Sequence, residues 1–473
     1  MNQHNYDKQN TLNSLVSEYE AMSQKGTVGF YEETVFSQLI DYYENESAID
    51  LALEVIEQAL NQHLFSTTLH CRKAALLALQ KQEAAALKAL RQAELLSPMD
   101  YEVKLMKAEV YALFGDFTLA LSMVKDLKVA CHINNTQQLA AIFFSEGVIY
   151  EKMQQYDAMF LAWKQTLKFN PTHKQALDKI WLCIEMSRRF DESVELCHQI
   201  IDREPYCAKA WYNLGHAQTY FGNYKEAIEA YEYAFIIDKE FEWAYRHCAE
   251  LCMEIKEYEK ALDCYQEGMP YMLHDGELLL KIGQCYQFLG KATIAEGFYH
   301  RSLQLDELND EVYYYLGTCH AELKNWIKAI RFYKKAIAID DEREEYYAAL
   351  GETFAQLGDN QKALRNFQTA IDLAPEQAIY WVQLALFLVD HSDILSALDL
   401  LADADDYAVG AELLYCKSIC LFKMDENKEA MHVLADALTE DFDMHPFLFE
   451  YLPHLALDRK IQAILDFYKY EQL

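Results

Sequence analysis

The sequence predicts an all-α protein that repeats one helical hairpin along most of its length, and three observations lead to this expectation. Turn formers are scarce, with 15 glycines and 7 prolines in 473 residues, which disfavours barrels, sandwiches and low-complexity tracts. Apolar residues make up 52% of the chain and aromatic residues 13%, so a large core can form and global disorder is excluded. The third observation is a regular internal period.

A small residue marks this period and recurs about every 34 positions. The marker positions are Ala52, Ala86, Ala120, Met159, Ser193, Ala227, Ala261, Ala295, Ala329, Ala363, Ala397 and Ala430. The spacing is 34 throughout, except for 39 residues before Met159 and 33 before Ala430. Each unit holds two blocks of apolar residues at helical spacing with a turn-forming break between them, which predicts a helical hairpin.

Two units show the repeat pattern most clearly. The unit that begins at Ala208 carries Trp211, Leu214, Gly215, Tyr224, Ala227, Tyr231 and Ala234. The unit that begins at Glu344 carries Tyr347, Leu350, Gly351, Phe354, Ala363, Phe367, Ala370 and Pro375. In this order and spacing the residues resemble the tetratricopeptide repeat (TPR) family. The resemblance implies a right-handed α-α superhelical TPR solenoid of about twelve helix-turn-helix repeats, with a concave groove that binds proteins.

The period divides the chain into three parts. Residues 1–32 form a polar N-terminal lead, with a short helix expected over residues 12–22. Residues 33–440 hold the twelve TPR-like repeats, and the extra residues before Met159 are expected as a longer loop near residues 128–139. We expect C-terminal capping helices over residues 441–473, because a terminal hairpin otherwise exposes apolar surface.

The charge of the chain excludes several classes of partner. The net charge is −33, and a polyanion of this size repels phosphate backbones and anionic lipid, so neither nucleic acid nor membrane is an expected partner. The first ten residues lack the basic and apolar regions of a secretory signal. The 12 cysteines form no CxxC pair, which suits a reducing compartment. We therefore expect a cytoplasmic protein.

Catalytic motifs are missing from the sequence, which has no GxGxxG, GxxxxGK[ST], GxSxG or HExxH. We expect no enzyme, no cofactor and no bound metal. One alternative is a metal-binding or enzymatic protein, since thiolates and imidazole suit zinc. Its ligands would be His247, Cys248, Cys252 and Cys264. Core packing is favoured for these cysteines, because Cys416 and Cys420 repeat the spacing elsewhere and free cysteine is often buried.

The TPR resemblance also implies which side chains face the groove, at fixed positions of the first helix of each repeat. In the central repeats these include Tyr212, His216, Tyr220, Trp243, Arg246, His247, Glu250, Phe288, Tyr314 and Tyr315. Aromatic rings interleaved with carboxylates suit a peptide or helix of a partner protein that carries basic and apolar side chains. The alternative is that the tyrosines pack between repeats and the acids keep the surface hydrated.

Some TPR proteins hold the carboxyl terminus of a chaperone with a clamp of Lys, Asn and Arg on successive first helices. Here Asn213 is followed by His247 and Lys281 at the equivalent positions. The neighbouring carboxylates of Glu250 and Glu277 would repel a chain terminus. The sequence therefore argues against a receptor for chaperone tails.

A second candidate surface lies in the later repeats, where groove positions become apolar. It comprises Ile379, Val382, Leu386, Val389, Tyr415, Ile419 and Phe422. Residues 366–416 contain nine acids and no Lys or Arg, so the strip could receive a basic amphipathic helix. Burial by the chain's own C-terminal helices or in a homodimer is favoured instead, because large exposed apolar patches are rare on monomers.

Two further functions are alternatives to binding a partner protein. Residues 66–130 carry nine Lys and Arg against seven acids and could attract the acidic end of another copy, which would give a self-assembling structural protein. RNA binding by helical repeats needs a basic groove, and the groove residues here are acidic or apolar. A protein-binding scaffold or adaptor is the function that the sequence favours.

Overall fold

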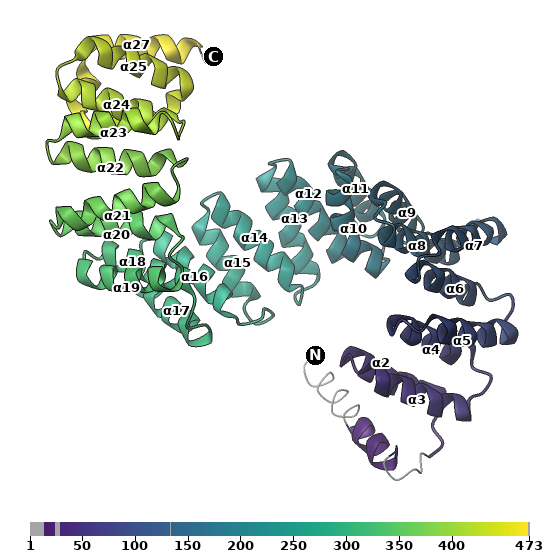
Figure 1. The fold of residues 1–473 in the computed structure, drawn as a ribbon. Coiled ribbons are helices and arrows are strands. Elements are labelled where there is room, and N and C mark those ends of the chain that lie inside the picture. The colour runs from purple at the N-terminus through teal and green to yellow at the C-terminus, as the bar shows by residue number, and fades with distance from the viewer. Residues whose placement is uncertain (1–13, 24–28, 133, 472–473) are drawn as a thin grey trace. The chain divides into compact units, whose positions relative to one another are not determined.

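The computed structural model describes residues 14–23, 29–132 and 134–471, and this part of the chain contains helices and no strand (Figure 1). Contacts divide the chain into two compact units, residues 1–244 and 245–473. Within each unit neighbouring helices pack as hairpins, for example α12 with α13 and α20 with α21. The predicted all-α solenoid of helical hairpins is confirmed. The number of repeats stays a prediction.

In the first unit residues 14–23 are helical. The helices that follow are α2 (Glu33–Asn45), α3 (Ile49–Gln62), α4 (Thr67–Leu79), α5 (Glu83–Leu96), α6 (Tyr101–Leu113), α7 (Phe117–Ala130), α8 (Thr136–Lys152), α9 (Tyr156–Phe169), α10 (Lys174–Ser187), η1 (Phe190–Glu192), α11 (Ser193–Arg203), α12 (Ala208–Tyr220) and α13 (Tyr224–Ile237). The next helix, α14 (Glu242–Glu254), begins in the first unit and ends in the second.

The second unit continues in the same way. Its helices are α15 (Tyr258–Gly268), α16 (Gly276–Phe288), α17 (Ala292–Leu305), α18 (Asp310–Glu322), α19 (Trp326–Ile339), α20 (Glu344–Gln356), α21 (Asn360–Leu373), α22 (Ala378–Asp390), α23 (Ile394–Ala404), α24 (Ala411–Lys423), α25 (Asn427–Glu440), η2 (Phe442–Met444), α26 (Pro446–Tyr451), η3 (Pro453–Leu457) and α27 (Arg459–Glu471).

Small residues let the two helices of a hairpin approach closely. A β-carbon on Gly317 of α18 would lie 2.5 Å from the Tyr333 ring of α19, which is closer than carbon atoms pack. The same relation joins Gly283 of α16 to the ring of Tyr299 in α17. Both tyrosines are buried. The glycine of the first helix and the aromatic residue of the second are therefore one packing unit.

Each hairpin turn passes through one residue with a left-handed backbone. These residues are Ser47, Lys81, Gly115, Gln154, Arg188, Gly222, Lys256, Gly290, Lys324, Gly358, Ser392 and Asp425. Glycine adopts this conformation without strain, whereas other L-residues adopt it at a cost of about 1 kcal/mol. Their spacing follows the period of the sequence, so the turn geometry repeats even where the turn residue changes.

The helix over residues 14–23 is more than a polar lead. Val16 and Tyr19 are buried, and they pack against Phe36 in the core of the first hairpin. Leu12, where we expected this helix to begin, lies outside the described residues. The N-terminal segment thus covers one end of the hairpin stack in the first unit.

The longer loop expected near residues 128–139 is wrong. Helix α8 begins at Thr136 and has 17 residues, whereas α12 has 13. Most of the extra residues therefore lengthen a helix rather than a loop. Apolar and small residues continue at helical spacing through this segment, with Leu139, Ala140 and Ile142 buried, so helix is the favoured conformation.

The C-terminal segment packs on the last hairpin. Buried side chains from this segment meet the buried face of α25 in one cluster, which includes Leu434, Leu438, Leu448, Leu452, Leu455, Ile461 and Leu465. Among the described residues, no helix is long and apolar enough to cross a membrane.

Candidate functional site

First helices of neighbouring hairpins contact one another in both units, and the surface that these helices share within a unit is here called the A-helix face. In the first unit α10 contacts α12, and in the second unit α18 contacts α20, which contacts α22. The predicted groove residues belong to these helices. Hollows on the A-helix face are therefore the places to look for a binding site.

The A-helix face of the first unit carries a hollow of about 300 Å³, here called the aromatic hollow. Its lining residues come from α10, α12, the connection before α14 and the first turn of α14. They are Leu177, Asp178, Trp181, Leu182, Lys209, Tyr212, Asn213, His216, Phe241 and Trp243. Three predicted groove residues, Tyr212, His216 and Trp243, are thus brought together.

Ring contacts fix the geometry of the aromatic hollow. The Trp181 ring stacks on His216 with centroids 5.1 Å apart, and Tyr212 meets the same imidazole edge-on at 4.5 Å. Phe241 lies 4.8 Å from Tyr212, and Trp243 is 56% exposed. The walls are therefore rigid, apolar and open to solvent, which suits an inserted side chain.

Polar groups complete the floor of this hollow. Lys209 forms an ion pair with Asp178, and burial lowers the pKa of the lysine. Asn213 is buried, and its Nδ2 donates a hydrogen bond to the Leu177 carbonyl oxygen at 3.0 Å. The hollow therefore offers one cation and one anion that already neutralise each other, so apolar and aromatic contacts dominate its chemistry.

Two residues of the aromatic hollow, Trp181 and Phe241, are not among the predicted groove residues. Trp181 occupies a position where the repeat usually has a small residue, and that departure was the available signal. Phe241 lies in the connection before α14, outside the first-helix positions to which the family resemblance assigns the groove. Tyr220 does not line the hollow; its ring stacks on Phe190 with centroids 3.6 Å apart.

The A-helix face of the second unit carries two adjoining hollows, here called the acidic groove. The first hollow, of about 560 Å³, is lined by Tyr314, Thr318, Ala321, Glu322, Lys324, Trp326, Tyr333, Ala349, Glu352, Thr353 and Gln356. The second, of about 300 Å³, is lined by Glu352, Ala355, Gln356, Phe367, Gln383, Leu386, Phe387, Asp390 and Tyr451. Glu352 and Gln356 belong to both, so the hollows form one groove over α18, α20 and α22.

Tyrosine hydroxyl groups report the negative field of the acidic groove. Burial raises the pKa of Tyr314, and the carboxylates of Glu345 and Glu352 raise it further. Burial also raises the pKa of Tyr333, with smaller contributions that include Glu352 and Glu322. The groove therefore combines phenol rings with several carboxylates, and it favours cationic side chains.

Other predicted groove residues of the second unit lie elsewhere. Arg246 is buried, and its Nη2 donates to the Leu273 carbonyl oxygen at 3.1 Å and to Asp275 Oδ2 at 3.2 Å. The Arg246 guanidinium therefore binds groups of its own chain. Glu250 is exposed, Phe288 stacks on Tyr258 at 4.8 Å, and Tyr315 is half-buried with a pKa raised to about 12 by burial.

Most of the predicted C-terminal apolar strip lies in the core. Val382, Leu386 and Val389 of α22 are buried in one cluster, against which residues of α26 pack. Tyr415, Ile419 and Phe422 of α24 are buried in a second cluster with the C-terminal segment. Ile379 is the exception at 47% exposure. Helices after residue 440 thus occupy the space that the strip left open.

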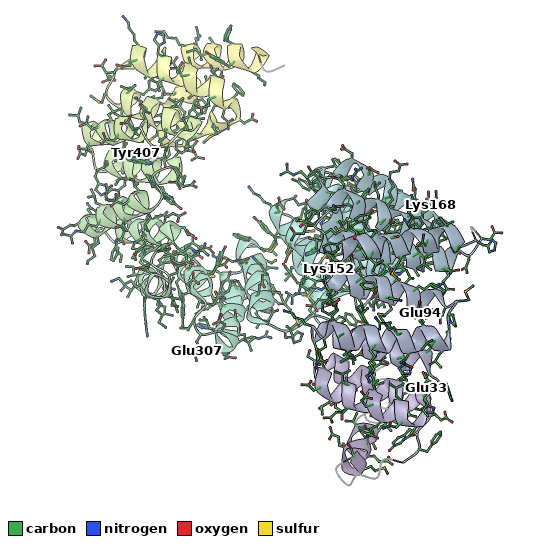
Figure 2. All side chains as sticks on the ribbon, turned by 45° about the vertical axis from the view of Figure 1, so that its right-hand side comes forward. Glu33, Glu94, Lys152, Lys168, Glu307 and Tyr407 are labelled. Atoms are coloured by element: carbon green, nitrogen blue, oxygen red, sulfur yellow. The ribbon has the colours of Figure 1, made fainter. Side chains whose placement is uncertain are left out.

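One exposed ring stands near this strip. Tyr407, labelled in Figure 2, follows α23 and is 61% exposed, and its ring stacks on Trp381 of α22 with centroids 6.0 Å apart. The Tyr415 hydroxyl is turned inward and donates to the Asp441 carbonyl oxygen at 2.8 Å. Tyr407 therefore meets solvent, whereas Tyr415 is buried.

The residues of the metal-site alternative lie where α14 and α15 meet. In the described part of the chain, no three His, Cys, Asp or Glu side chains are arranged to hold a metal ion. Cys248, Cys252 and Cys264 are buried thiols, and the Sγ atoms of Cys248 and Cys264 are 3.5 Å apart where α14 packs on α15. Burial lowers the pKa of His247. The three cysteines are therefore buried side chains of this helix pair.

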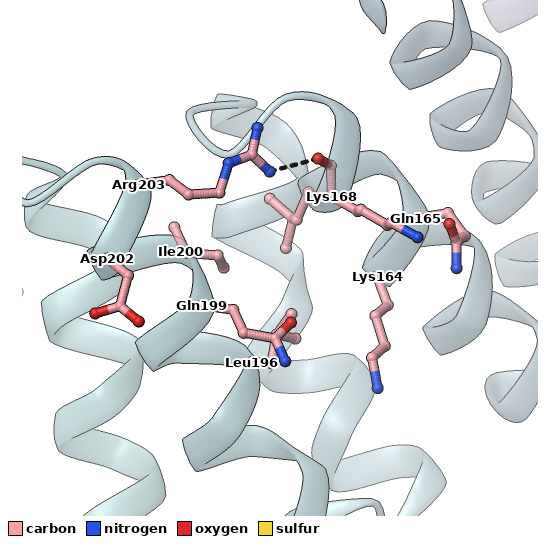
Figure 3. Close-up of a pocket in the computed structure, with 9 residues that line it drawn as sticks. Lys164, Gln165, Lys168, Leu196, Gln199, Ile200, Asp202 and Arg203 are labelled. Carbon is pink, nitrogen blue, oxygen red and sulfur yellow. Dashed lines mark hydrogen bonds between the residues drawn. The ribbon is translucent and has the colours of Figure 1, made fainter. Parts of the chain in front are cut away.

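A further hollow, of about 520 Å³, lies between the second helices α9 and α11 and is here called the basic hollow (Figure 3). Lys164, Lys168 and Arg203 line it together with Leu196 and Ile200. Figure 3 shows the guanidinium of Arg203 donating to the Lys168 carbonyl oxygen, at 2.5 Å. Lys164 forms an ion pair with Glu192, which does not line the hollow.

Three family models, each described as tetratricopeptide repeat, match residues 208–241, 310–376 and 348–410. Among curated proteins, the chain is similar to the Hsp70-Hsp90 organizing protein of Triticum aestivum, with 28% identity over 106 residues, which are 22% of this chain and 18% of that protein. The match therefore spans about a fifth of the length of that relative.

Solved structures of low sequence identity also resemble the chain. The APC/C hetero-tetramer Cut9-Hcn1 gives a TM-score of 0.39 at 14% identity, over 85% of this chain and 96% of that chain. YrrB, described as a TPR protein with an unusual peptide-binding site, gives a TM-score of 0.33 at 20% identity, over 40% of this chain and 96% of that chain.

Proposed function

We propose that this chain, a tetratricopeptide repeat protein, works as an adaptor that binds segments of other proteins. The family resemblance predicted from the repeat at Ala208 is confirmed. The relative from Triticum aestivum is, by its name, an organizer of Hsp70 and Hsp90. That name supports protein binding as the function proposed for this chain. Scaffold families of this kind act without chemistry of their own, and the adaptor proposed here is non-enzymatic.

The proposal names the A-helix face as the binding surface and an extended segment with basic and apolar side chains as the ligand. One observation carries it: the hollows on this face have rigid aromatic walls in the first unit and carboxylates beside phenol rings in the second. Aromatic walls anchor apolar side chains, and unpaired carboxylates attract basic ones. Tyr212 and Trp243 are the anchors in the aromatic hollow, and Tyr314 is the anchor in the acidic groove.

The segment bound is internal to the partner rather than its carboxyl terminus. Glu322 and Glu352 line the acidic groove, and Lys209 of the aromatic hollow is already paired with Asp178. A terminal carboxylate would meet repulsion in the groove and a neutralised lysine in the hollow. This distinguishes the proposed ligand from a chaperone tail.

We place the adaptor in the cytoplasm, with no cofactor. All 12 cysteines are free thiols in the structure, and such a number of reduced cysteines suits a reducing compartment. Fractionation of native cells with an antibody to the chain tests this location.

Selection from a displayed library of random short peptides tests the proposed ligand. The expected binders combine Lys or Arg with apolar residues and bind as synthetic peptides in fluorescence anisotropy. Tyr212→Ala should weaken peptides that use the aromatic hollow about tenfold, because a buried aromatic anchor carries much of the binding free energy.

Tyr206→Ala is the matched control, since Tyr206 is 87% exposed and lines none of the hollows described above. Circular dichroism establishes that both variants are folded. The proposal is wrong if no peptide is selected above background, or if the selected peptides bind Tyr212→Ala and a Tyr314→Ala variant as tightly as the wild type.

A further inference from the structure

The exposed face of α19 is basic, although the chain as a whole is acidic. Residues 323–339 contain no Asp or Glu, whereas the net charge of the chain is −33. The exposed cations of this stretch are Lys324, Lys328, Arg331, Lys334 and Lys335. Side chains three and four positions apart are neighbours on a helix, so these cations repel one another. Carboxylates from outside the helix would relieve that repulsion.

An apolar side chain stands among these cations. Ile327 is 78% exposed, and Arg331 and Lys335 follow it four and eight positions later, so the three side chains lie along one line of the helix. They are here called the basic stripe. The Lys335 ammonium lies 4.9 Å from the centroid of the Tyr313 ring, but in the described part of the chain neither cation of the stripe forms an ion pair. The basic stripe thus presents apolar area and uncompensated positive charge to solvent.

Helix α23 carries the same arrangement with the opposite charge. Leu395, Asp399 and Asp403 lie 68 positions after the members of the basic stripe, which is two periods of 34 residues. Leu395 is 65% exposed, and both carboxylates are exposed. Within the described residues neither carboxylate forms an ion pair. These three residues are here called the acidic stripe.

The two stripes lie apart in one molecule. Both α19 and α23 are second helices of hairpins, and the hairpin of α20 and α21 stands between theirs (Figure 1). Equivalent positions of a repeat face the same way from their hairpins, so the two stripes share one side of the second unit. Each stripe therefore keeps its charges exposed within one copy, and a second copy offers each stripe its complement.

We propose that the second unit forms a dimer with a second copy of this chain, in which the basic stripe of one copy packs against the acidic stripe of the other. A two-fold arrangement makes this contact twice, because each copy supplies both stripes. The cations would meet the carboxylates, and the exposed side chains of Ile327 and Leu395 would add apolar contact. The inference does not depend on the proposed function, which concerns the A-helix face.

Electrostatic effects at two ranges determine how strongly the copies associate. The net charge of −33 makes two copies repel one another. At physiological ionic strength the Debye length is about 8 Å, so this repulsion is screened while charges in direct contact still attract. Two helix stripes make a small interface, and we therefore expect a weak dimer with a Kd on the order of 10 μM.

Sedimentation velocity of the full chain over a range of concentrations tests the dimer. Two variants reverse one stripe each. Arg331→Glu with Lys335→Glu makes both stripes acidic, and Asp399→Arg with Asp403→Lys makes both stripes basic. Each variant alone should associate about tenfold more weakly than the wild type, because like charges then meet.

An equal mixture of the two variants is the decisive sample. In the mixture an acidic stripe of one variant meets a basic stripe of the other at both contacts, and the two changes in net charge cancel. Association should therefore return to nearly the wild-type Kd. Recovery also shows that both variants are folded, which circular dichroism of each variant checks separately.

The matched control is Lys428→Glu with Arg459→Glu. Both side chains are exposed in the second unit and lie outside α19 and α23, and the change in net charge equals that of the first variant. This control should dimerise like the wild type. Tyr314→Ala, which alters the acidic groove, should also leave dimerisation unchanged, so failure of the dimer and failure of the proposed function are distinguishable.

Four results would overturn this interface. The first is a wild-type chain that stays monomeric at about 100 μM, well above the expected Kd. The others are reversed variants that associate like the wild type, a mixture that fails to recover, and an equal loss of association in the control. The comparison of each variant alone with the mixture uses the same two proteins, so it does not depend on small differences in their stability.

Discussion

A β-carbon on Gly215 would lie 2.4 Å from the Cε1 atom of Tyr231. The glycine belongs to α12 and the tyrosine to α13, and the ring is buried at 2% exposure. The two residues are 16 positions apart in the sequence, so two positions of the repeat specify this packing contact. The same 16-residue spacing joins Gly283 to Tyr299 and Gly317 to Tyr333, so this contact recurs with the repeat.

Gly215→Ala should lower the free energy of unfolding of the first unit by about 2 kcal/mol, because the added methyl group forces the Tyr231 ring out of its place. Urea unfolding followed by circular dichroism measures the change. Gly297→Ala is the control, since nothing lies within 4 Å of the added carbon in α17. The control should be neutral or stabilising, and an equal loss in both variants would contradict the packing argument.

The hairpin turns offer a reciprocal pair of substitutions. Gly222 has φ +73°, and Lys256 has φ +65° at the equivalent turn of the next hairpin. Gly222→Ala should destabilise its unit by about 1 kcal/mol, because a side chain is strained in the left-handed region. Lys256→Gly should cost nothing or add slightly to stability. Thermal unfolding of both variants tests this, and destabilisation by Lys256→Gly would show that the lysine side chain matters more than the backbone.

Glu109 predicts a dependence of stability on pH. The carboxyl group accepts a hydrogen bond from Ser145 Oγ between α6 and α8, and burial raises its pKa above the ordinary value of 4.5 although this hydrogen bond opposes the shift. The folded state then holds the proton more tightly than the unfolded state, so this group favours folding at low pH. Its contribution is lost as pH rises through the folded pKa.

Glu109→Gln should therefore unfold at a higher temperature than the wild type at neutral pH, with the difference vanishing below the ordinary value of 4.5. Glutamine keeps an acceptor for Ser145 and carries no charge. Glu102→Gln, on the exposed surface of the same helix, is the control and should show no such trend. A difference that is constant across pH would contradict the buried-carboxyl explanation.

The C-terminal segment predicts a position-specific effect on the second unit. Ile461 is 1% exposed and Phe467, on the same helix, is 57% exposed. Ile461→Asp should lower the free energy of unfolding by about 3 kcal/mol, because it places a charge against α25. Phe467→Asp should have little effect. Chemical denaturation distinguishes them, and equal behaviour would mean that α27 contributes no core.

The fold could be predicted from the sequence because its signal is repeated. The marker alanines set the register, and pairs such as Gly317 and Tyr333 recur at the same spacing, so each hairpin supports the assignment of the next. The prediction that the extra residues before Met159 form a loop was wrong. A longer interval in the period does not indicate whether the extra residues extend a helix or a loop. The burial of side chains in α8 favours a helix here. Burial depends on which residues pack against the segment, and the period does not specify these residues.

The candidate site was predicted less well than the fold. Tyr212, His216 and Trp243 were found because the family positions of the first helix name them. Phe241 and Tyr451 were missed because they come from a connection and from the C-terminal segment, which have no place in the repeat. The buried strip residues, such as Leu386 and Tyr415, followed the family positions but meet helices that the family pattern does not include.

The length of helix α8 indicates which insertions a chain of helical hairpins tolerates. Its 17 residues exceed the 13 of α12 by four, which is close to the 3.6 residues of one helical turn. A whole added turn returns every later side chain to nearly its former direction, so the downstream hairpins keep their buried faces. An insertion of about one turn at the start of a helix thus leaves the buried faces of the other hairpins almost unchanged. An insertion of half a turn would instead rotate an apolar face into water. A helix of this protein can therefore gain a whole turn without compensating substitutions in the repeats that follow.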